Sequence, residues 1–475
     1  MVKVSGQRKK VVIVGGGITG LSAAYKMQQI AREQGYLLDL VLIEGKSQLG
    51  GKIQTVKRDG FVIERGPDSF LIRKKSMTEL AKAVGVGDEL VKNATGQAYI
   101  WLNQELYPIP AGSVMGIPTQ LRPFMRTGLF SVVGKLRAMG DLVLPKTKSE
   151  GDQSLGHFFK RRLGNEVVEN LIEPLLSGVY AGDIDQMSLQ STYPQFSVVE
   201  KNHRSLIKGM RKTATNQAPG RNGANVKKEG VFYSFKNGLD TLVTAIEEQL
   251  DDVEILKSTF VEAIDQKDEQ TVLTVDDGLK IEADAVILTT GHEVARRLFQ
   301  PYSVLQQLGN IPTTSVATIA LAFPEDAISQ KEQGTGFLVA RKSGLSITAC
   351  TWLHRKWPMT TPKGKVLLRA FVGKVGDDAI VDLPDADIER IVLEELGQIM
   401  DIKTQPDFSI VTRWKEDRPQ YRVGHKELVR EAKEQLKAVF PTVWLAGASY
   451  EGVGLPDCVD QGEEAAVEVL AQLFK

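Results

Sequence analysis

The sequence of 475 residues predicts an α/β protein, α+β overall, with a discontinuous Rossmann-like domain, a mixed-sheet domain and a helical lobe. Three observations lead to this prediction. A strand, a glycine-rich turn and a helix open the chain, and the same succession closes it. Helical patterns dominate residues 72–210, and short strand-like runs follow from residue 231 onward. The first domain is therefore expected to form from segments far apart in the sequence.

The opening motif predicts a dinucleotide site. Residues 11–14 are four β-branched apolar residues, typical of a buried parallel strand. Gly15, Gly17 and Gly20 fit the pattern G-x-G-x-x-G, which permits a tight turn, close backbone approach to a diphosphate and close helix–strand packing. The helix N-terminus that follows favours an anion. A second predicted strand ends in Glu44, 24 residues beyond Gly20, at the spacing of a carboxylate that binds ribose hydroxyls.

Two more turns follow this motif. Paired glycines precede Lys52, whose cation is suited to a diphosphate or a flavin. A short predicted strand then ends in the rigid turn at Gly66 and Pro67. A plain NAD-dependent dehydrogenase needs neither segment.

Composition excludes several classes of protein. Lys and Arg total 59, as do Asp and Glu, so the formal net charge is zero and no nucleic-acid partner is expected. Cys350 and Cys458 form no disulfide framework or CxxC site, and the five histidines lack metal-ligand spacing, so no metal is expected. No apolar run reaches about 18 residues and no signal peptide is recognised. We therefore expect a cytoplasmic protein without a transmembrane segment.

Residues 72–210 predict the helical lobe, with helix-like segments at 77–84, 119–144 and 155–177. Residues 107–134 are apolar, rich in proline and glycine, and end in an amphipathic pattern. Either this lobe only packs against the rest of the protein, or it also makes a peripheral contact with a membrane. The zero net charge favours packing, because it offers no attraction to anionic lipid.

Residues 211–230 hold almost no apolar side chains and predict a flexible loop. A helix, strand-like runs, a hairpin and a buried strand follow, at residues 239–250, 253–264, 272–281 and 285–288. The mixed sheet is predicted from strand-like residues 313–324, 334–339, 345–352 and 366–372, with an amphipathic helix at 385–400. Gly334 and Gly336 lie in this strand pattern, where glycine either admits a ligand or forms a bulge.

The C-terminal segment completes the predicted site. A buried strand ends at residues 444–446 and passes into a glycine-rich stretch. Pro456 and Asp457 then open a helix that runs to about Phe474. Its N-terminus can direct positive potential at a flavin ring, which favours FAD over NAD.

Together these motifs resemble a known group of flavoproteins. G-x-G-x-x-G, an acid, Gly-Gly-Lys-Ile and Glu-x-Gly-Pro occur in the order seen in the FAD-dependent monoamine oxidase-like superfamily, which includes phytoene desaturase. The closest resemblance is to the soluble Gram-positive bacterial type of the coproporphyrinogen III oxidase and protoporphyrinogen oxidase family. It is carried by KIQTVKRDGFVIERGPDSFLIRKKS, NLIEPLLSGVYAGD, TRWKEDRPQY and GASYEGVGLPDC. It covers nearly the whole chain and is weakest across residues 211–230.

The resemblance implies a domain division and a set of contacts. Residues 1–71, 231–291 and 407–475 would form the FAD-binding domain, residues 72–210 the helical lobe, residues 211–230 the loop, and residues 292–406 the substrate-binding domain. The implied cofactor contacts are Gly15, Gly16, Gly17, Ile18, Thr19, Gly20, Glu44, Lys52, Gly66, Pro67, Asp68, Ser69, Val261, Trp414, Val453, Gly454 and Leu455. Val261 would meet the adenine through its backbone.

The resemblance also implies a reaction. Coproporphyrinogen III would lose six electrons to become coproporphyrin III in haem synthesis, in three two-electron cycles, with oxygen as acceptor and hydrogen peroxide as product. Protoporphyrinogen IX is the alternative substrate. A flat macrocycle with carboxylates on its edge needs an apolar slot with cations at the rim. Lys74, then Arg73, are the predicted cations, with Gly334 and Gly336 as further substrate contacts. No catalytic acid or base is assigned.

Other functions fit the same scaffold. One is a carotenoid desaturase or an amine oxidase, although neither cysteine lies in a recognisable flavin-attachment motif. Another is a non-enzymatic escort protein for prenylated GTPases, which needs no flavin-facing glycine passage near the C-terminus. A transient contact with a ferrochelatase, which would receive the product, also stays open.

Overall fold

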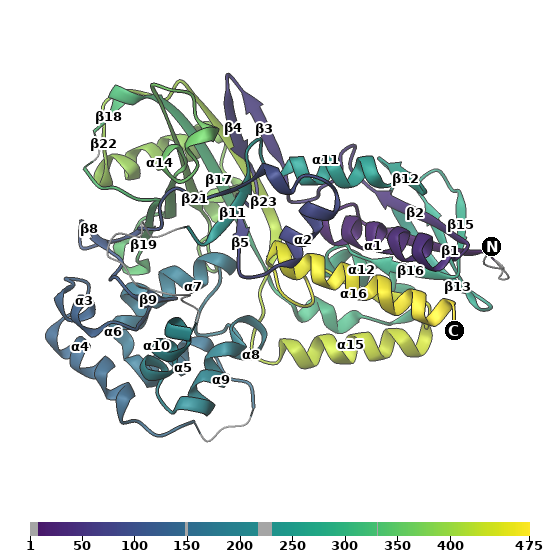
Figure 1. Cartoon of the computed structure of the whole chain (residues 1–475), viewed down its shortest axis with the longest axis horizontal. Coiled ribbons are helices and arrows are strands. Elements are labelled where there is room, and N and C mark those ends of the chain that lie inside the picture. The colour runs from purple at the N-terminus through teal and green to yellow at the C-terminus, as the bar shows by residue number, and fades with distance from the viewer. Residues whose placement is uncertain (1–7, 148–150, 217–229, 330) are drawn as a thin grey trace.

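The computed structural model describes residues 8–147, 151–216, 230–329 and 331–475. Figure 1 shows three regions: a parallel sheet with its helices on the right, a larger sheet at the upper left, and a group of helices at the lower left. The predicted mixture of helices with parallel and mixed sheets is confirmed. The domain boundaries stay a prediction.

A five-stranded parallel sheet lies at the centre of the first region. Its order is β12–β2–β1–β16–β24, with bounds Val253–Lys257, Leu38–Glu44, Lys9–Val14, Ala285–Leu288 and Val443–Leu445. Every neighbouring pair runs parallel. Residues 11–14 of β1 are buried, as expected for an apolar strand that is covered on both faces.

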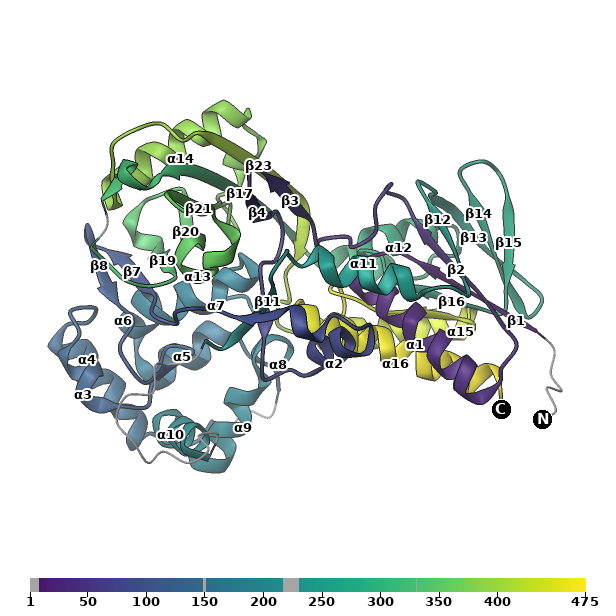
Figure 2. The same ribbon diagram turned by 45° about the horizontal axis from the view of Figure 1, so that its top comes forward.

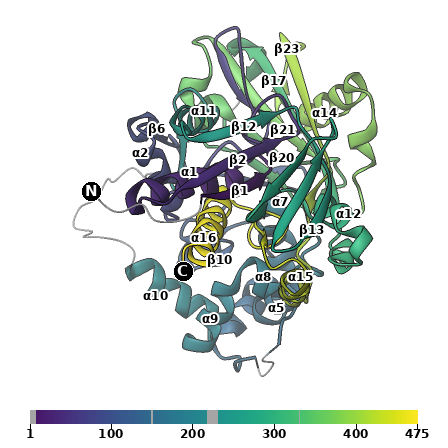
Figure 3. The ribbon, with the colours of Figure 1, turned by 90° about the vertical axis from the view of Figure 1, so that its right-hand side faces the viewer.

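Both faces of this sheet are covered (Figure 3). One face packs against α1 (Ile18–Gln34), α2 (Ser76–Ala83), α11 (Asp240–Gln249) and α16 (Leu455–Leu473). The other packs against the antiparallel strands β13 (Val261–Lys267), β14 (Gln270–Val275) and β15 (Lys280–Ala283), and against α12 (His292–Leu298) and α15 (His425–Val439). Helices α1 and α16, from opposite ends of the chain, pack side by side.

The second region is a seven-stranded mixed sheet. Its order is β23–β17–β21–β20–β19–β7–β8, with bounds Phe408–Pro419, Thr313–Pro324, Lys365–Val372, Ile347–Trp352, Gly336–Val339, Tyr99–Leu102 and Glu105–Pro108. Strands β19 and β7 run parallel, and the other pairs antiparallel. In Figures 1 and 2, helix α14 (Asp385–Ile399) covers the side of this sheet that faces away from the helical region. The short helix α13 (Leu353–Lys356) follows β20.

The third region is helical. Its helices are α3 (Leu121–Arg126), α4 (Val132–Met139), α5 (Leu155–Leu163), α6 (Asn165–Val167), α7 (Glu173–Tyr180), α8 (Leu189–Thr192), α9 (Pro194–His203) and α10 (Leu206–Asn216). Phe158, Phe159 and Phe196 pack edge to face in its core. In the same region, the buried guanidinium of Arg162 binds Asp141 and Glu200.

Short strands complete the fold. They are the pairs β3 (Thr55–Arg58) with β4 (Phe61–Glu64), β9 (Ser113–Val114) with β10 (Ile117–Pro118) and β18 (Ile328–Ser329) with β22 (Asp401–Ile402), and the set β5 (Phe70–Leu71), β11 (Phe232–Phe235) and β6 (Leu90–Lys92).

Several predicted elements differ from the structure. Residues 119–144 and 155–177 are each divided into shorter helices, and β7 and β8 interrupt the supposedly helical residues 72–210 because they extend the large sheet. Helix α10 continues through residues 211–216 of the predicted loop, and residues 217–229 lie outside the described part. Strand β23 and helix α15 had no predicted counterpart, and β23 joins the large sheet rather than the parallel one.

The exposed side of the helical region bears on the open question of membrane contact. On α4, Val132, Val133 and Leu136 are 69%, 76% and 62% exposed. These exposed apolar side chains are compatible with either expectation for the lobe, so packing alone and packing with peripheral membrane contact both stay predictions. Within the described residues, no helix has the length and apolar character needed to cross a bilayer.

Candidate functional site

A cavity of about 840 Å³ lies at the carboxyl end of β1. Segments that are hundreds of residues apart meet around it. The predicted contacts among its lining residues are Gly15, Gly17, Ile18, Thr19, Glu44, Lys52, Gly66, Pro67, Asp68, Ser69, Trp414, Val453, Gly454 and Leu455. The structure thus brings most of the predicted cofactor residues to one cavity.

The glycine turn has the shape that a diphosphate requires. Gly15 has φ +110°, a conformation that favours glycine. A Cβ at Gly20 would lie 1.9 Å from the carbonyl oxygen of Gly15, so only glycine lets α1 start this close to the turn. A Cβ at Gly17 would meet no atom nearer than 4.0 Å, because this residue borders the cavity. The first turn of α1 holds no acidic residue and no capping side chain, which leaves its N–H groups available to an anion.

The Glu44 carboxylate is held in place beside this turn. Its Oε2 accepts from the Gly16 N–H at 2.7 Å, and its Oε1 accepts from the Lys46 N–H at 2.8 Å. Gly16 itself does not line the cavity, because it packs behind the turn against Leu49. Glu44 keeps further acceptor capacity toward the cavity, as a ribose hydroxyl requires.

A second helix N-terminus reaches the same cavity. Helix α16 begins at Leu455 without a capping side chain, and Gly462 allows it to pack on α1, since a Cβ there would lie 2.2 Å from the Thr19 carbonyl oxygen. The hydroxyl of Thr290, which also lines the cavity, is buried without a hydrogen-bond partner. Free N–H groups, an unpartnered hydroxyl and a glycine backbone are what a dinucleotide cofactor would satisfy.

Asp68 lies at the centre of a buried cluster of charged side chains that borders the cavity. Its Oδ2 lies 2.8 Å from Lys356 Nζ and 3.4 Å from Arg369 Nη2, and its Oδ1 accepts from the Ser69 hydroxyl at 2.7 Å. Burial by itself would raise the pKa of Asp68, but the two cations and these hydrogen bonds outweigh it and hold the pKa well below its ordinary value. The carboxylate is therefore charged, and the two cations exceed it by one.

Two predicted residues are tied to the large sheet. Lys52 Nζ donates to the Asp417 carbonyl oxygen at 2.6 Å and pairs with its carboxylate at 3.0 Å. Burial lowers the pKa of Lys52, against the charge of Asp417. Trp414 Nε1 donates to the Arg65 carbonyl oxygen at 3.2 Å. Both side chains border the cavity from positions that join the two sheets.

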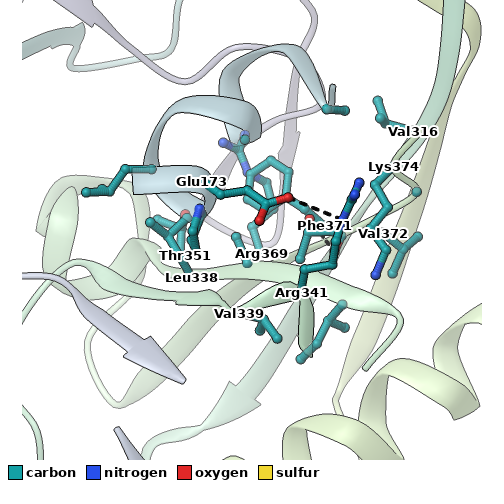
Figure 4. A pocket seen from close by; sticks show the side chains of 18 of the residues that line it. Glu173, Val316, Leu338, Val339, Arg341, Thr351, Arg369, Phe371, Val372 and Lys374 are labelled. Atoms are coloured by element: carbon teal, nitrogen blue, oxygen red, sulfur yellow. Dashed lines mark hydrogen bonds and ion pairs between the residues drawn. The ribbon is translucent and has the colours of Figure 1, made fainter. Parts of the chain in front are cut away.

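A second cavity, of about 390 Å³, continues from the first. The two share Asp68, Ser69, Gly178, Arg369, Phe371 and Arg418. Its walls include the apolar side chains Val316, Leu338, Val339, Ile347 and Val372. Figure 4 shows Glu173, Arg341 and Lys374 among them, with Glu173 and Arg341 joined by an ion pair. An apolar slot with cations therefore adjoins the cofactor cavity.

Other predicted contacts lie elsewhere. Gly20 supports the turn from behind, and Val261 is buried at an irregular point of β13, away from both cavities. Lys74 forms an ion pair with Asp457 in the first turn of α16, and Arg73 is exposed; neither lines the two cavities. The predicted substrate role of these two cations stays a prediction, and Lys74 is paired with Asp457 in this structure.

Gly334 and Gly336 lie close to neighbouring backbone and do not border either of the two cavities. A Cβ at Gly334 would lie 2.5 Å from the Gln97 carbonyl oxygen, and one at Gly336, where φ is +137°, would lie 2.1 Å from the Cys350 carbonyl oxygen. Neither glycine lines the cavities, so close contact with neighbouring backbone explains both.

Sequence reasoning missed Thr290, Arg369, Arg341 and Lys374. Thr290 follows β16 at the carboxyl end of a parallel strand, where ligands of such sheets bind, so its position carried a usable signal. Arg369 interrupts the apolar strand β21, and a cation in a buried strand is a second usable signal. Arg341 and Lys374 lie in turns with no motif.

Comparison with known proteins agrees with this site. The family described as "Flavin containing amine oxidoreductase" matches residues 18–470. The chain is 51% identical over 471 residues to the coproporphyrinogen III oxidase of Bacillus subtilis (strain 168), covering 99% of this chain and 100% of that one. It is 45% identical to the coproporphyrinogen III oxidase of Staphylococcus aureus (strain NCTC 8325 / PS 47), covering 98% and 100%.

A solved structure is similar over the same length. The crystal structure of a putative protoporphyrinogen oxidase from Exiguobacterium sp. 255-15 superposes with a TM-score of 0.87 at 39% identity, covering 98% of this chain and 100% of that one. The FAD cofactor predicted from the sequence is confirmed, and the escort-protein alternative falls away. This chain belongs to the family of flavin-containing amine oxidoreductases, as an FAD-dependent oxidoreductase.

Proposed function

We propose that this protein oxidises coproporphyrinogen III to coproporphyrin III, a loss of six electrons in haem synthesis, with oxygen as acceptor and hydrogen peroxide as product. The observation that carries the proposal is the apolar cavity with cations in its wall that continues from the cofactor cavity at Asp68 and Ser69. A flat macrocycle with carboxylates on its edge fits such a lining. The names of the relatives agree with this choice.

The residues of the chain have separate tasks in this proposal. The turn of α1, Glu44 and the N-terminus of α16 would hold the diphosphate, ribose and ring of FAD respectively. When bound, FAD supplies an acceptor of electron pairs from the macrocycle. The apolar walls exclude water and orient the macrocycle, and Lys356 and Arg369 keep positive charge beside the reacting region.

The decisive experiment compares two substrates without oxygen. The FAD-loaded protein is mixed anaerobically with coproporphyrinogen III or protoporphyrinogen IX, and the loss of visible flavin absorbance is followed. We expect faster loss with coproporphyrinogen III, followed by porphyrin fluorescence and one equivalent of peroxide per electron pair once air is admitted. Equal rates would defeat the substrate choice, and absence of bleaching with both would defeat the function.

Protoporphyrinogen IX is the second candidate substrate, because the solved relative that superposes well is titled a putative protoporphyrinogen oxidase. A carotenoid desaturase or an amine oxidase is less favoured, since the relatives that are 51% and 45% identical to this chain are named coproporphyrinogen III oxidase. We also propose a cytoplasmic location and a transient contact with a ferrochelatase, to be tested by fractionation and by co-purification.

A further inference from the structure

The second cavity carries a surplus of positive charge. Its charged lining residues are the cations Arg341, Lys356, Arg369, Lys374 and Arg418, and the acids Asp68 and Glu173, five against two. Asp68 is matched by Lys356 and Arg369 within the buried cluster. Of the other cations, Arg418 borders both cavities, whereas Arg341 and Lys374 border the second cavity alone. Lys374 also pairs at 3.2 Å with Asp377, an exposed residue that does not line the cavity. Such a surplus favours an anionic ligand.

Arg341, Lys374 and Glu173 come from three separate elements. Arg341 lies in the turn after β19, Lys374 follows β21, and Glu173 opens α7. The turn links the two cations, because Lys374 Nζ donates to the Leu345 carbonyl oxygen at 3.4 Å. Figure 4 shows Arg341 and Lys374 on the same side of the cavity, with Glu173 extended toward the guanidinium.

The ion pair with Glu173 engages one edge of the Arg341 guanidinium. The distance from Nε to Glu173 Oε1 is 3.4 Å, and no other ion-pair or hydrogen-bond partner of this guanidinium occurs among the residues that the structure describes. The terminal Nη groups are therefore available as a two-pronged donor, the arrangement that binds carboxylates best. Arg341 is 42% exposed and Glu173 12%, so the carboxylate comes from the buried side and fixes the direction of the guanidinium.

We propose that Arg341, oriented by Glu173 and assisted by Lys374, binds a carboxylate on the edge of the substrate macrocycle. The inference rests on the proposed function, since it names a contact of that substrate. It makes Arg341 a specificity-determining residue and Glu173 a positioning residue. It also assigns a carboxylate contact to this turn, in addition to the substrate role of Lys74 and Arg73, which stays a prediction.

The test distinguishes recognition of the substrate's carboxylate charge from recognition of the shape of the macrocycle. The FAD-loaded wild-type protein and Arg341→Gln are compared for the KM of coproporphyrinogen III and for binding of coproporphyrin III and its tetramethyl ester, followed by porphyrin fluorescence. We expect KM and the dissociation constant of the acid to rise about tenfold, with kcat and the ester affinity changed less than twofold. Lys342→Gln, at the neighbouring exposed residue, is the control and should match wild type.

A second variant tests the role of Glu173. Glu173→Gln keeps an acceptor for Arg341 Nε and removes a negative charge beside the incoming carboxylate, so the KM should fall two- to threefold. A structural defect would instead raise KM in both variants. If Arg341→Gln weakens acid and ester equally, or neither, the inference is overturned. If wild type binds coproporphyrin III in an Arg341-dependent way but does not oxidise coproporphyrinogen III, the proposed function fails and the inference stands.

Discussion

Single residues in this protein are constrained by what lies within a few ångströms. A Cβ at Gly20 would collide with the Gly15 carbonyl oxygen at the cofactor turn. A Cβ at Gly397, inside α14, would instead meet open space. Glu64 is buried and accepts hydrogen bonds from Leu239 N–H at 2.6 Å and the Thr55 hydroxyl at 2.9 Å. Burial raises its pKa to about 8, against these hydrogen bonds. Each of these environments makes a measurable prediction.

The two glycines should respond oppositely to alanine. Gly20→Ala should lower the free energy of unfolding by about 2 to 3 kcal/mol and cost most of the bound FAD, because the new Cβ would displace α1 from the turn. Gly397→Ala should raise stability by about 0.5 to 1 kcal/mol, since alanine restricts the unfolded chain and meets nothing. Chemical denaturation and the flavin content of purified protein measure both effects. Similar behaviour of the two variants would contradict this account of the turn.

Glu64 should make stability fall as pH rises. The folded protein keeps this proton up to pH about 8, whereas the unfolded chain loses it near the ordinary pKa of 4.5. Between these values the folded state binds more protons, so the stabilising contribution is present at low pH and is lost as pH rises through 8. Glu64→Gln, which resembles the protonated acid, should match wild type near pH 5 and exceed its stability increasingly toward pH 8.

Urea denaturation of both proteins at several pH values gives this comparison. A stability difference that stays constant with pH would show that Glu64 does not titrate in this way.

Whole elements are joined by buried charges in the helical region. Arg162 on α5 is fully buried and binds Asp141 and Glu200, with the Asp141 and Glu200 side chains 0% and 4% exposed. Its Nη2 also donates to the Arg204 carbonyl oxygen, after α9. This one side chain therefore ties α5 to two other parts of the lobe. Lys160, on the same helix, makes a partly exposed pair with Asp185.

Removing these two cations should have very different consequences. Arg162→Ala removes the cation that pairs with the buried Asp141 carboxylate and leaves Arg161 as the cation paired with Glu200. It should therefore destabilise the protein by about 3 to 5 kcal/mol. Lys160→Ala should cost less than about 1 kcal/mol, because its pair with Asp185 is solvated. Thermal unfolding of the two variants tests the contrast. Equal, small effects would mean that the buried network does not hold the helices together.

On the scale of the whole molecule, the cofactor cavity is a junction of chain segments. It is bordered by the turn of α1 and by the N-terminus of α16, which come from opposite ends of the sequence. Strand β23, which belongs to the large sheet, also borders it. A ligand at this junction would contact all three of these elements at once. Binding to the folded state alone must therefore raise the stability of every element that borders it.

FAD should accordingly stabilise the protein as a whole. At a free FAD concentration about one hundred times its dissociation constant, linkage adds about 2.7 kcal/mol to the free energy of unfolding. The thermal midpoint of flavin-depleted protein should rise steadily as FAD is titrated, whether it is followed by circular dichroism of the backbone or by Trp fluorescence. A midpoint independent of FAD would show that FAD does not bind the folded protein in preference to the unfolded chain.

The sequence predicted local features well and distant associations poorly. The glycine turn, Glu44 and the glycine passage into α16 were recognisable, because each depends on neighbours within a few positions of the chain. The prediction for Lys74 depends on its neighbours in the chain, whereas its ion-pair partner Asp457 lies 383 residues away and could not be recognised locally. Arg341, Lys374 and Glu173 carry no local pattern, and only the folding of three elements around one cavity brings them together. Strand β23 was missed because charged residues interrupt its apolar pattern at the sheet edge.

The packing of α16 on α1 also has a consequence for biosynthesis. A ribosome releases the N-terminal glycine turn long before it has made the last strand and helix, β24 and α16. Nascent chains that lack these elements hold only part of the nucleotide-binding surface, and the apolar side chains of α1 that pack on α16 are uncovered. Capture of FAD is then a step that follows translation, and chains terminated early should be colourless, prone to aggregate and dependent on chaperones.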